Sequence, residues 1–286
     1  MKENIKKFTE QFKIILFHVS PLHFISDITF KLSRIEEKTI KNVLIRLYIA
    51  LFKIKLDEYL IKNISEYKSL NDFFIRELDM SFREDLDNSD NIISPCDGTI
   101  AGFGNIDNST FIHAKKYKYS INELINEKSN DFNNGKFINI YLEPKDCHRI
   151  YMPCDADLIK VTHVPGKLYS VAPYATYGIK NLYSKNERVI LNFSNKDFKM
   201  SMIMVGAVNV GCITLSDYGI ISPAKYRSSI TEFKKENEIK SYKKGDEIGM
   251  FNLGSTVILL FSTNDKKWVR EIILDNKVSI RNKLLK

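Results

Sequence analysis

The chain has 286 residues, of which 44% are hydrophobic, and a formal net charge of +8 at pH 7. This length and apolar content exclude an intrinsically disordered chain and allow one large core, with or without a helical appendage. The excess of basic residues indicates an anionic partner, such as nucleic acid, an acidic lipid surface or a phosphorylated substrate, but does not choose among them.

The N-terminal part carries apolar residues at helical spacing from residue 5 to about residue 67, as at Ile5, Phe8, Phe12 and Ile15 and again at Val43, Leu47, Ala50 and Ile54. This pattern predicts about three amphipathic helices with a break near Pro21. Basic residues are expected on their charged faces: Lys6, Lys7, Lys13, Lys31, Lys38, Lys41 and Arg46. Such helices suit the plane of an anionic bilayer, but they would equally suit a cap that packs on the core and exposes a basic face.

No membrane-spanning segment is predicted. The best apolar run, residues 47–52, is flanked by Arg46 and Lys53 and falls far short of the roughly 20 residues that a spanning helix needs. The N-terminus also lacks a signal-peptide pattern. The four cysteines form no C-x-x-C pair and show no metal-type spacing to the five histidines, so we expect reduced thiols in a cytoplasmic compartment: Cys96, Cys147, Cys154 and Cys212.

Beyond about residue 92 the chain changes to short β-rich runs separated by Gly, Pro, Asn and Asp. The predicted strands are residues 135–142, 188–193, 200–210 and 256–261, and residues 197–202 and 244–249 are predicted to be turns or loops. The predicted fold class is therefore α+β, with N-terminal amphipathic helices followed by a mainly antiparallel β core.

Local features that could carry chemistry are individually weak. Asp97 precedes a glycine in a proline-containing turn, which turn chemistry alone explains. His148 follows a Pro-Lys-Asp loop and is either a satisfied, partly buried histidine or a proton-transfer group. Gly254 and Ser255 open an apolar strand, where a glycine ordinarily marks a bulge or bend. There is no dinucleotide fingerprint, Walker loop or nucleophile elbow, and nucleic-acid binding would rest on charge alone.

Taken in order, these segments resemble the phosphatidylserine decarboxylase family in its bacterial, membrane-associated form. Residues 253–256 read L-G-S-T, like the family's processing site, and residues 94–98 read S-P-C-D-G, like its S-P-x-D-G turn. Similar stretches occur at residues 71–78, 141–149, 152–154, 164–166, 186–189 and 205–207. The resemblance runs from about residue 70 to 262, while the N-terminal helices agree only in character.

The resemblance implies a self-processing proenzyme. The Ser255 hydroxyl would attack the carbonyl of Gly254, and elimination and hydrolysis would leave a pyruvoyl group in place of Ser255, with a β chain of residues 1–254 and an α chain of residues 255–286. This group would form a Schiff base with the amine of phosphatidylserine and accept the electrons left by CO2, giving phosphatidylethanolamine. No metal or external cofactor is implied.

The same resemblance assigns roles to site residues. Asp97 would orient the base of self-cleavage, and His148 would serve decarboxylation as the first histidine of an H-x-x-H motif. The second histidine, used for self-cleavage, is replaced here by Tyr151, a much weaker base because its ordinary pKa is near 10. His163 stands where an aromatic residue is expected. It is a hypothetical replacement if the histidine and the tyrosine have exchanged places across neighbouring strands.

We therefore expect a helical membrane-association region over residues 1–70 and a β-rich catalytic domain over residues 71–286. The protein would lie peripherally on the cytoplasmic face of the cell membrane, bind phosphatidylserine and the anionic surface but not nucleic acid, and have a homodimer as one option for its assembly. Two alternatives remain open: a non-processing, non-catalytic membrane-associated relative, and a pyruvoyl enzyme that decarboxylates another amino-containing substrate.

Overall fold

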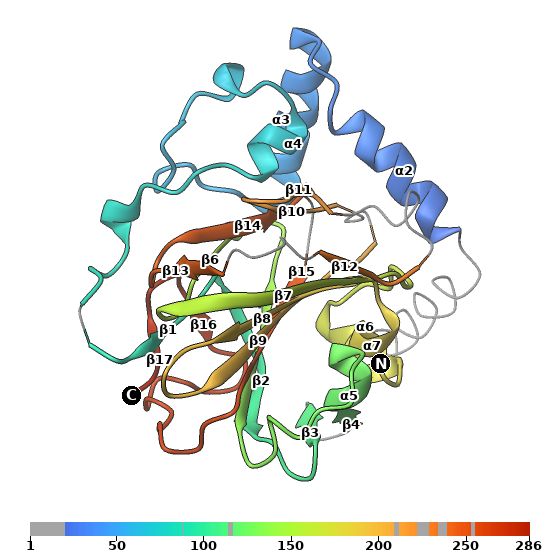
Figure 1. Cartoon of the computed structure of the whole chain (residues 1–286). Helices are drawn as coiled ribbons and strands as arrows, with labels where there is room; N and C mark the ends of the chain where they lie inside the picture. The colour runs from blue at the N-terminus through green and yellow to red at the C-terminus, as the bar shows by residue number, and fades with distance from the viewer. Residues whose placement is uncertain are drawn as a thin grey trace, which may run out of the picture.

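The computed structural model describes residues 21–87, 89–113, 117–208, 212–221, 229–233, 239–252 and 255–286. Figure 1 shows a β body with helices α2, α3 and α4 gathered at one end of it and shorter helices at its side. The predicted helix at Ile5 to Ile15, the basic residues Lys6, Lys7 and Lys13, and the residues Leu253 and Gly254 lie outside the described residues.

The body is built on a nine-stranded antiparallel sheet, which confirms the predicted α+β class and its antiparallel core. Its strand order is β12-β7-β8-β9-β15-β5-β2-β16, with β13 pairing with β7 as well. The strands are β2 (Gly98–Asn105), β5 (Lys136–Leu142), β7 (Ala156–Val164), β8 (Arg188–Ser194), β9 (Lys199–Val205), β12 (Thr231–Phe233), β13 (Lys240–Tyr242), β15 (Ser255–Phe261) and β16 (Lys277–Val278).

Three smaller antiparallel sheets complete the described β structure. The four-stranded one has the order β11-β10-β14-β6, and β1 pairs with β17 and β3 with β4. Their bounds are β1 (Ile92–Ile93), β3 (Thr110–His113), β4 (Tyr117–Ser120), β6 (Arg149–Tyr151), β10 (Ile213–Leu215), β11 (Gly219–Ile220), β14 (Glu247–Phe251) and β17 (Lys283–Leu285). The four-stranded sheet lies beneath α3 and α4 in Figure 1.

Strand β15 lies at the centre of the large sheet. It pairs with β5 over seven residues and with β9 over six, and every residue of β15 is buried. A strand covered on both faces explains the continuous apolar sequence of residues 257–261. This central position also means that β15 is held by residues that precede their partners by 51 to 125 positions.

The predicted turns were partly wrong. Residues 195–198 do form a turn, in which the Asn195 side chain accepts hydrogen bonds from the backbone N–H groups of Asp197 and Phe198, but β9 already begins at Lys199. Similarly, β14 begins at Glu247. In both segments the charged residues occupy the end of a strand, where a polar side chain reaches solvent or a partner without breaking the ladder. The strand predicted over residues 200–210 ends at Val205 within the described residues.

The N-terminal helices are α2 (Leu22–Leu32) and α3 (Lys38–Phe52), and α4 (Leu70–Phe74) follows. The break predicted near Pro21 is confirmed, since α2 begins immediately after it. The helical pattern predicted to residue 67 is wrong beyond Phe52, because Lys53 adopts a left-handed conformation that ends α3. Two 3-10 turns (Ile64–Glu66, Met80–Phe82) and the short helices α5 (Ile121–Ile125), α6 (Pro173–Gly178) and α7 (Leu182–Lys185) complete the set.

Helices α2 and α3 each keep an exposed apolar stripe at four-residue spacing. The stripes are Phe24, Ile28 and Leu32 on α2, and Val43, Leu47 and Leu51 on α3. Lys41, predicted on a charged face, is instead buried, with its ammonium 3.0 Å from Asn42 Oδ1 and 3.1 Å from the Ser65 carbonyl. Within the described part of the chain, no helix is both long and apolar enough to cross a bilayer.

Candidate active site

Ser255 is the first residue of β15 and is fully buried. It pairs with Leu142 at the end of β5, and the next hydroxyl, that of Thr256, lies 2.8 Å from the Ile140 carbonyl. The Ser255 Oγ has no hydrogen-bond partner among the described residues. Buried hydroxyls are normally satisfied, so an unsatisfied one at a strand start makes this serine a candidate for chemistry.

His148 lies in the loop that leaves β5 and returns as β6, and its side chain is fully buried. Its Nδ1 is 2.9 Å from the Asp146 carbonyl, and its ring packs against Phe74 with centroids 4.1 Å apart. Because a carbonyl only accepts, Nδ1 carries the proton and Nε2 has a free lone pair. That Nε2 has no partner among the described residues. Burial, and then the charge of Arg76, lower the pKa of His148 to about 3, so the imidazole is neutral.

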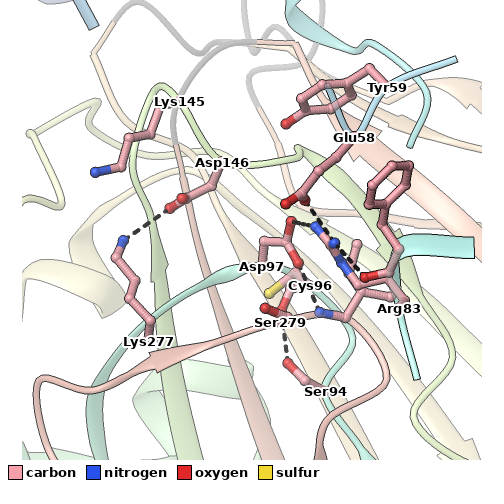
Figure 2. Close-up of polar contacts among 12 residues, drawn as sticks. Glu58, Tyr59, Arg83, Ser94, Cys96, Asp97, Lys145, Asp146, Lys277 and Ser279 are labelled. Carbon is pink, nitrogen blue, oxygen red and sulfur yellow. Dashed lines mark hydrogen bonds and ion pairs between the residues drawn. The ribbon is translucent and has the colours of Figure 1, made fainter. Parts of the chain in front are cut away.

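The loop before His148 is held from two sides. Arg76, itself almost completely buried, donates to the Lys145 carbonyl at 2.6 Å. From the C-terminal part of the chain, Lys277 reaches Glu143 at 2.9 Å and Asp146 at 3.6 Å, and Figure 2 shows Lys277 pointing at Asp146. The backbone carbonyl that orients His148 is therefore placed by residues far apart in the sequence.

Asp97 makes its contacts with a cation and a backbone amide. One carboxylate oxygen accepts from Arg83 at 2.8 Å, and the other accepts from the Ile280 N–H at 2.8 Å. Figure 2 shows Arg83 lying between the carboxylates of Asp97 and Glu58, and the Arg83–Glu58 distance is also 2.8 Å. Neither His148 nor His163 is a hydrogen-bond partner of this carboxylate.

Comparisons with known proteins connect this geometry to one family. The sequence model of the family described as phosphatidylserine decarboxylase matches residues 70–284. The phosphatidylserine decarboxylase proenzyme of Legionella pneumophila (strain Corby) is 36% identical over 277 residues, which cover 96% of this chain and 97% of that protein. The proenzyme of Francisella tularensis subsp. novicida (strain U112) is 41% identical over 254 residues, covering 88% and 89%. The chain belongs to the phosphatidylserine decarboxylase family.

Tyr151 stands where the family resemblance implies a second histidine, and its surroundings in the structure make it a poor base. Tyr151 lies in β6, is buried in a small cluster with Cys147 and Ile280, and donates its backbone N–H to the Pro95 carbonyl at 2.8 Å. Burial raises the pKa of the Tyr151 phenol well above its ordinary value. The phenol therefore stays protonated at physiological pH and cannot accept a proton.

His163 has an acidic partner of its own. Its Nε2 is 2.9 Å from Glu187 Oε1, both side chains are almost completely buried, and His163 Nδ1 has no partner among the described residues. The hypothesis that His163 and Tyr151 exchanged places across neighbouring strands is wrong in its geometry. His163 lies in β7 of the large sheet, whereas Tyr151 lies in β6 of the four-stranded sheet.

The strand register separates His163 from Ser255. His163 is level with Val189, Met204 and Val257 on successive strands, so three inter-strand steps intervene. At about 4.8 Å per step the two backbones lie roughly 14 Å apart along the sheet. Glu187 is closer, because its carbonyl accepts from Gly206, the residue that follows the Val205 partner of Thr256. The His163–Glu187 pair therefore lies two to three inter-strand steps from Ser255 in the large sheet.

Sequence reasoning did not find Arg83, the partner of Asp97, or Glu187, the partner of His163. Glu187 carried a signal, since a carboxylate immediately before the apolar strand β8 is expected to need a buried partner. Arg83 carried none, because it lies in an irregular segment among other charged residues.

All four cysteines are free and buried, consistent with the reduced thiols expected.

Proposed function

We propose that this protein decarboxylates phosphatidylserine to phosphatidylethanolamine, by means of a pyruvoyl group formed from Ser255 when the bond between residues 254 and 255 is cut. The observation that carries the proposal is the Ser255 hydroxyl itself, which is fully buried and without a partner among the described residues at the head of the central strand. Membership of the phosphatidylserine decarboxylase family supports both the reaction and the substrate.

The surroundings of Ser255 suit a covalent pyruvoyl group. Such a group supplies an electrophilic carbonyl that takes up the electron pair left when CO2 departs, which no ordinary side chain can do. A buried position at the strand head excludes water, and β5 pairs with residue 255 while β9 pairs with residue 256, which holds this backbone in place. The structure provides these conditions with residues of this chain alone.

We assign proton transfer to His148. Its neutral ring presents an unprotonated Nε2, the form needed to accept the Ser255 proton during self-cleavage. Phe251 donates its backbone N–H to the His148 carbonyl at 3.0 Å, which places His148 beside the strand end four residues before Ser255. With Tyr151 unable to act and His163 distant along the sheet, His148 serves both self-cleavage and decarboxylation. A base of such low pKa predicts slow self-cleavage.

Asp97 is assigned a positioning role, in place of direct contact with the base. Its bond to the Ile280 N–H joins the residue 94–99 turn to what would become the α chain, and its ion pair with Arg83 fixes the carboxylate. The family resemblance gave Asp97 the role of the acid that orients the base of self-cleavage. In this chain the group that orients His148 is the Asp146 carbonyl.

The exposed stripes of α2 and α3 support a peripheral position on the cytoplasmic face of the cell membrane. Apolar side chains at four-residue spacing, with the exposed cations Lys31 and Arg46 on the same helices, form a surface suited to an anionic bilayer. A membrane surface would bring the site to its lipid substrate. The helical-cap reading explains the buried faces of α2 and α3 but leaves these stripes without a role.

The deciding experiment has two readouts on the same preparation. Intact mass under denaturing conditions should show two species that meet at residues 254 and 255, the smaller one lighter than its sequence by the loss of ammonia. Thin-layer separation of lipids should show phosphatidylethanolamine formed from phosphatidylserine. Ser255→Ala should give neither result, and His148→Gln should give a chain that remains largely uncut.

The alternatives make different predictions in this experiment. A non-processing relative would give one uncut chain and no product. A pyruvoyl enzyme of another amino-containing substrate would give the cut chain without phosphatidylethanolamine. Either outcome would refute the proposed function, and the mass alone tells the two apart.

A further inference from the structure

Arg34 follows the end of α2 and is a half-buried cation beside the chain segment that leads to Ser255. We propose that its guanidinium binds the phosphate of the phospholipid substrate. This inference rests on the proposed function and adds to it a substrate-binding residue that fixes the lipid headgroup.

The contacts of Arg34 leave its charge uncompensated. Its guanidinium lies over the Phe30 ring at 3.6 Å, donates to the Phe30 carbonyl at 3.2 Å and contacts Cys212 Sγ at 3.6 Å. In the described part of the chain no carboxylate lies within ion-pair distance of Arg34, whereas Arg83 and Arg149 both have such partners. Burial lowers the pKa of Arg34, which reflects the cost of removing this cation from water. An anion bound there would offset that cost.

Hydrogen bonds connect the residues around Arg34 to the part of the chain that precedes Ser255. The Asn71 N–H donates to the carbonyl of Ser33, the residue before Arg34, at 2.7 Å, and the Asn71 amide donates to Asn252 Oδ1 at 3.2 Å. Asn252 in turn donates its backbone N–H to the Cys212 carbonyl at 2.9 Å. Since Asn252 precedes Ser255 by three residues, at most about 10 Å of chain separates them. Arg34 is therefore joined to Asn252, three residues before Ser255, by two routes, one through Ser33 and Asn71 and one through Cys212.

The order of groups along this path matches the order of groups in a phospholipid. The exposed apolar stripe of α2 comes first, the Arg34 cation next, and Cys212 after it. Burial raises the pKa of the Cys212 thiol, Arg34 lowers it, and the Glu187 carboxylate raises it again, so both a cation and an anion act on Cys212. Phosphatidylserine carries acyl chains, then a phosphate, then an ammonium group. A guanidinium is well matched to a phosphate because it can donate two parallel hydrogen bonds.

The test measures binding of a soluble phospholipid by calorimetry. The probe is dihexanoyl phosphatidylethanolamine, kept below its micelle concentration so that membrane attachment plays no part. Arg34→Gln should weaken binding about 10- to 100-fold, the expected loss for a hydrogen-bonded charge pair. The affinity of Arg34→Lys should fall between that of Arg34→Gln and that of the unaltered protein. Arg46→Gln is the matched control, because it removes the same charge from an exposed site on α3 and should leave binding unchanged.

Equal binding by Arg34→Gln and the unaltered protein would overturn the inference, as would an equal loss in Arg46→Gln, which would show a general charge effect. A thermal unfolding midpoint that stays constant in Arg34→Gln excludes misfolding as the cause of its weaker binding. The same titration on uncut Ser255→Ala separates this inference from the proposed function. Arg34-dependent binding together with an unaltered protein that forms no product would refute the function alone, and product formation by the unaltered protein without Arg34-dependent binding would refute the inference alone.

Discussion

The Arg83 guanidinium bonds the Asp97 carboxylate at 2.8 Å, and both side chains are almost completely buried. The same guanidinium reaches Glu58, so one cation joins the segment after α3 to the turn that precedes β2. Asp97 also accepts from the Ile280 N–H, near the C-terminus. This arrangement makes Asp97 the junction of three distant parts of the chain, and it places the acid of the S-P-x-D-G turn on an arginine where the family resemblance implied a histidine.

Asp97→Asn should therefore lower stability more than it slows cleavage. Loss of the ion pair would leave Arg83 buried without full compensation, and we expect the free energy of unfolding to fall by about 3 kcal/mol. Urea unfolding followed by Trp268 fluorescence measures this, and Arg83→Gln should show a similar loss. Cleavage should slow by no more than about tenfold, far less than in His148→Gln. Abolished cleavage with unchanged stability would instead show that Asp97 takes part in the chemistry directly.

His163→Ala should be cut at close to the normal rate, because three inter-strand steps separate His163 from Ser255. The expected cost is in stability, since Glu187 would be left buried without its imidazole partner. A time course of cleavage in a cell-free synthesis reaction, read by gel shift, checks this against His148→Gln. If His163→Ala stayed uncut while folding normally, the base would have to be the His163–Glu187 pair.

Stability should fall as the pH is lowered below about 6.5. The folded pKa of His148 is about 3 and its unfolded value is near 6.5, so between these values the unfolded chain binds the extra proton. The contribution of neutral His148 to the free energy of unfolding is fully present above the unfolded pKa. It is lost toward pH 3 at about 1.4 kcal/mol per pH unit. Urea unfolding at pH 7, 6 and 5 measures the slope, which should be smaller in His148→Gln. An identical slope in that variant would show that other groups dominate.

The two chains should stay together after cleavage. Residues 255–286 contribute β15 between β5 and β9, β16 beside β2 and β17 beside β1, and these residues include the fully buried positions 255–261. Size-exclusion chromatography under native conditions should therefore give a single peak that contains both fragments, and 6 M guanidinium should separate them. Release of the small fragment in native buffer would contradict the central position of β15.

Replacing the exposed stripe of α3 should weaken membrane binding. Leu47→Ser with Leu51→Ser removes two side chains that are 63% and 73% exposed, so folding should be little affected while the apolar area available to a bilayer shrinks. Co-sedimentation with anionic vesicles should show at least a several-fold loss of bound protein. Ile159→Ser, at a 56% exposed position on β7, is the matched control. If the double variant bound vesicles as well as the unaltered protein does, α2 and α3 would instead be a cap that packs on the core.

The sequence alone determined the family, through motifs such as L-G-S-T at residues 253–256. It also determined the α+β class and the main strands, because short apolar runs between turn residues, such as residues 257–261, are typical of strands covered on both faces. It also led to the prediction that Ser255 and His148 are site residues. Only the tertiary structure decided the partners of the charged groups. Arg34 meets Cys212 across 178 positions and Ile280 meets Asp97 across 183, contacts that exist only once the strands have paired in register. An amphipathic pattern likewise predicts that a helix has an apolar face, but whether that face is buried depends on what packs against it, and on α2 and α3 a stripe of it stays exposed.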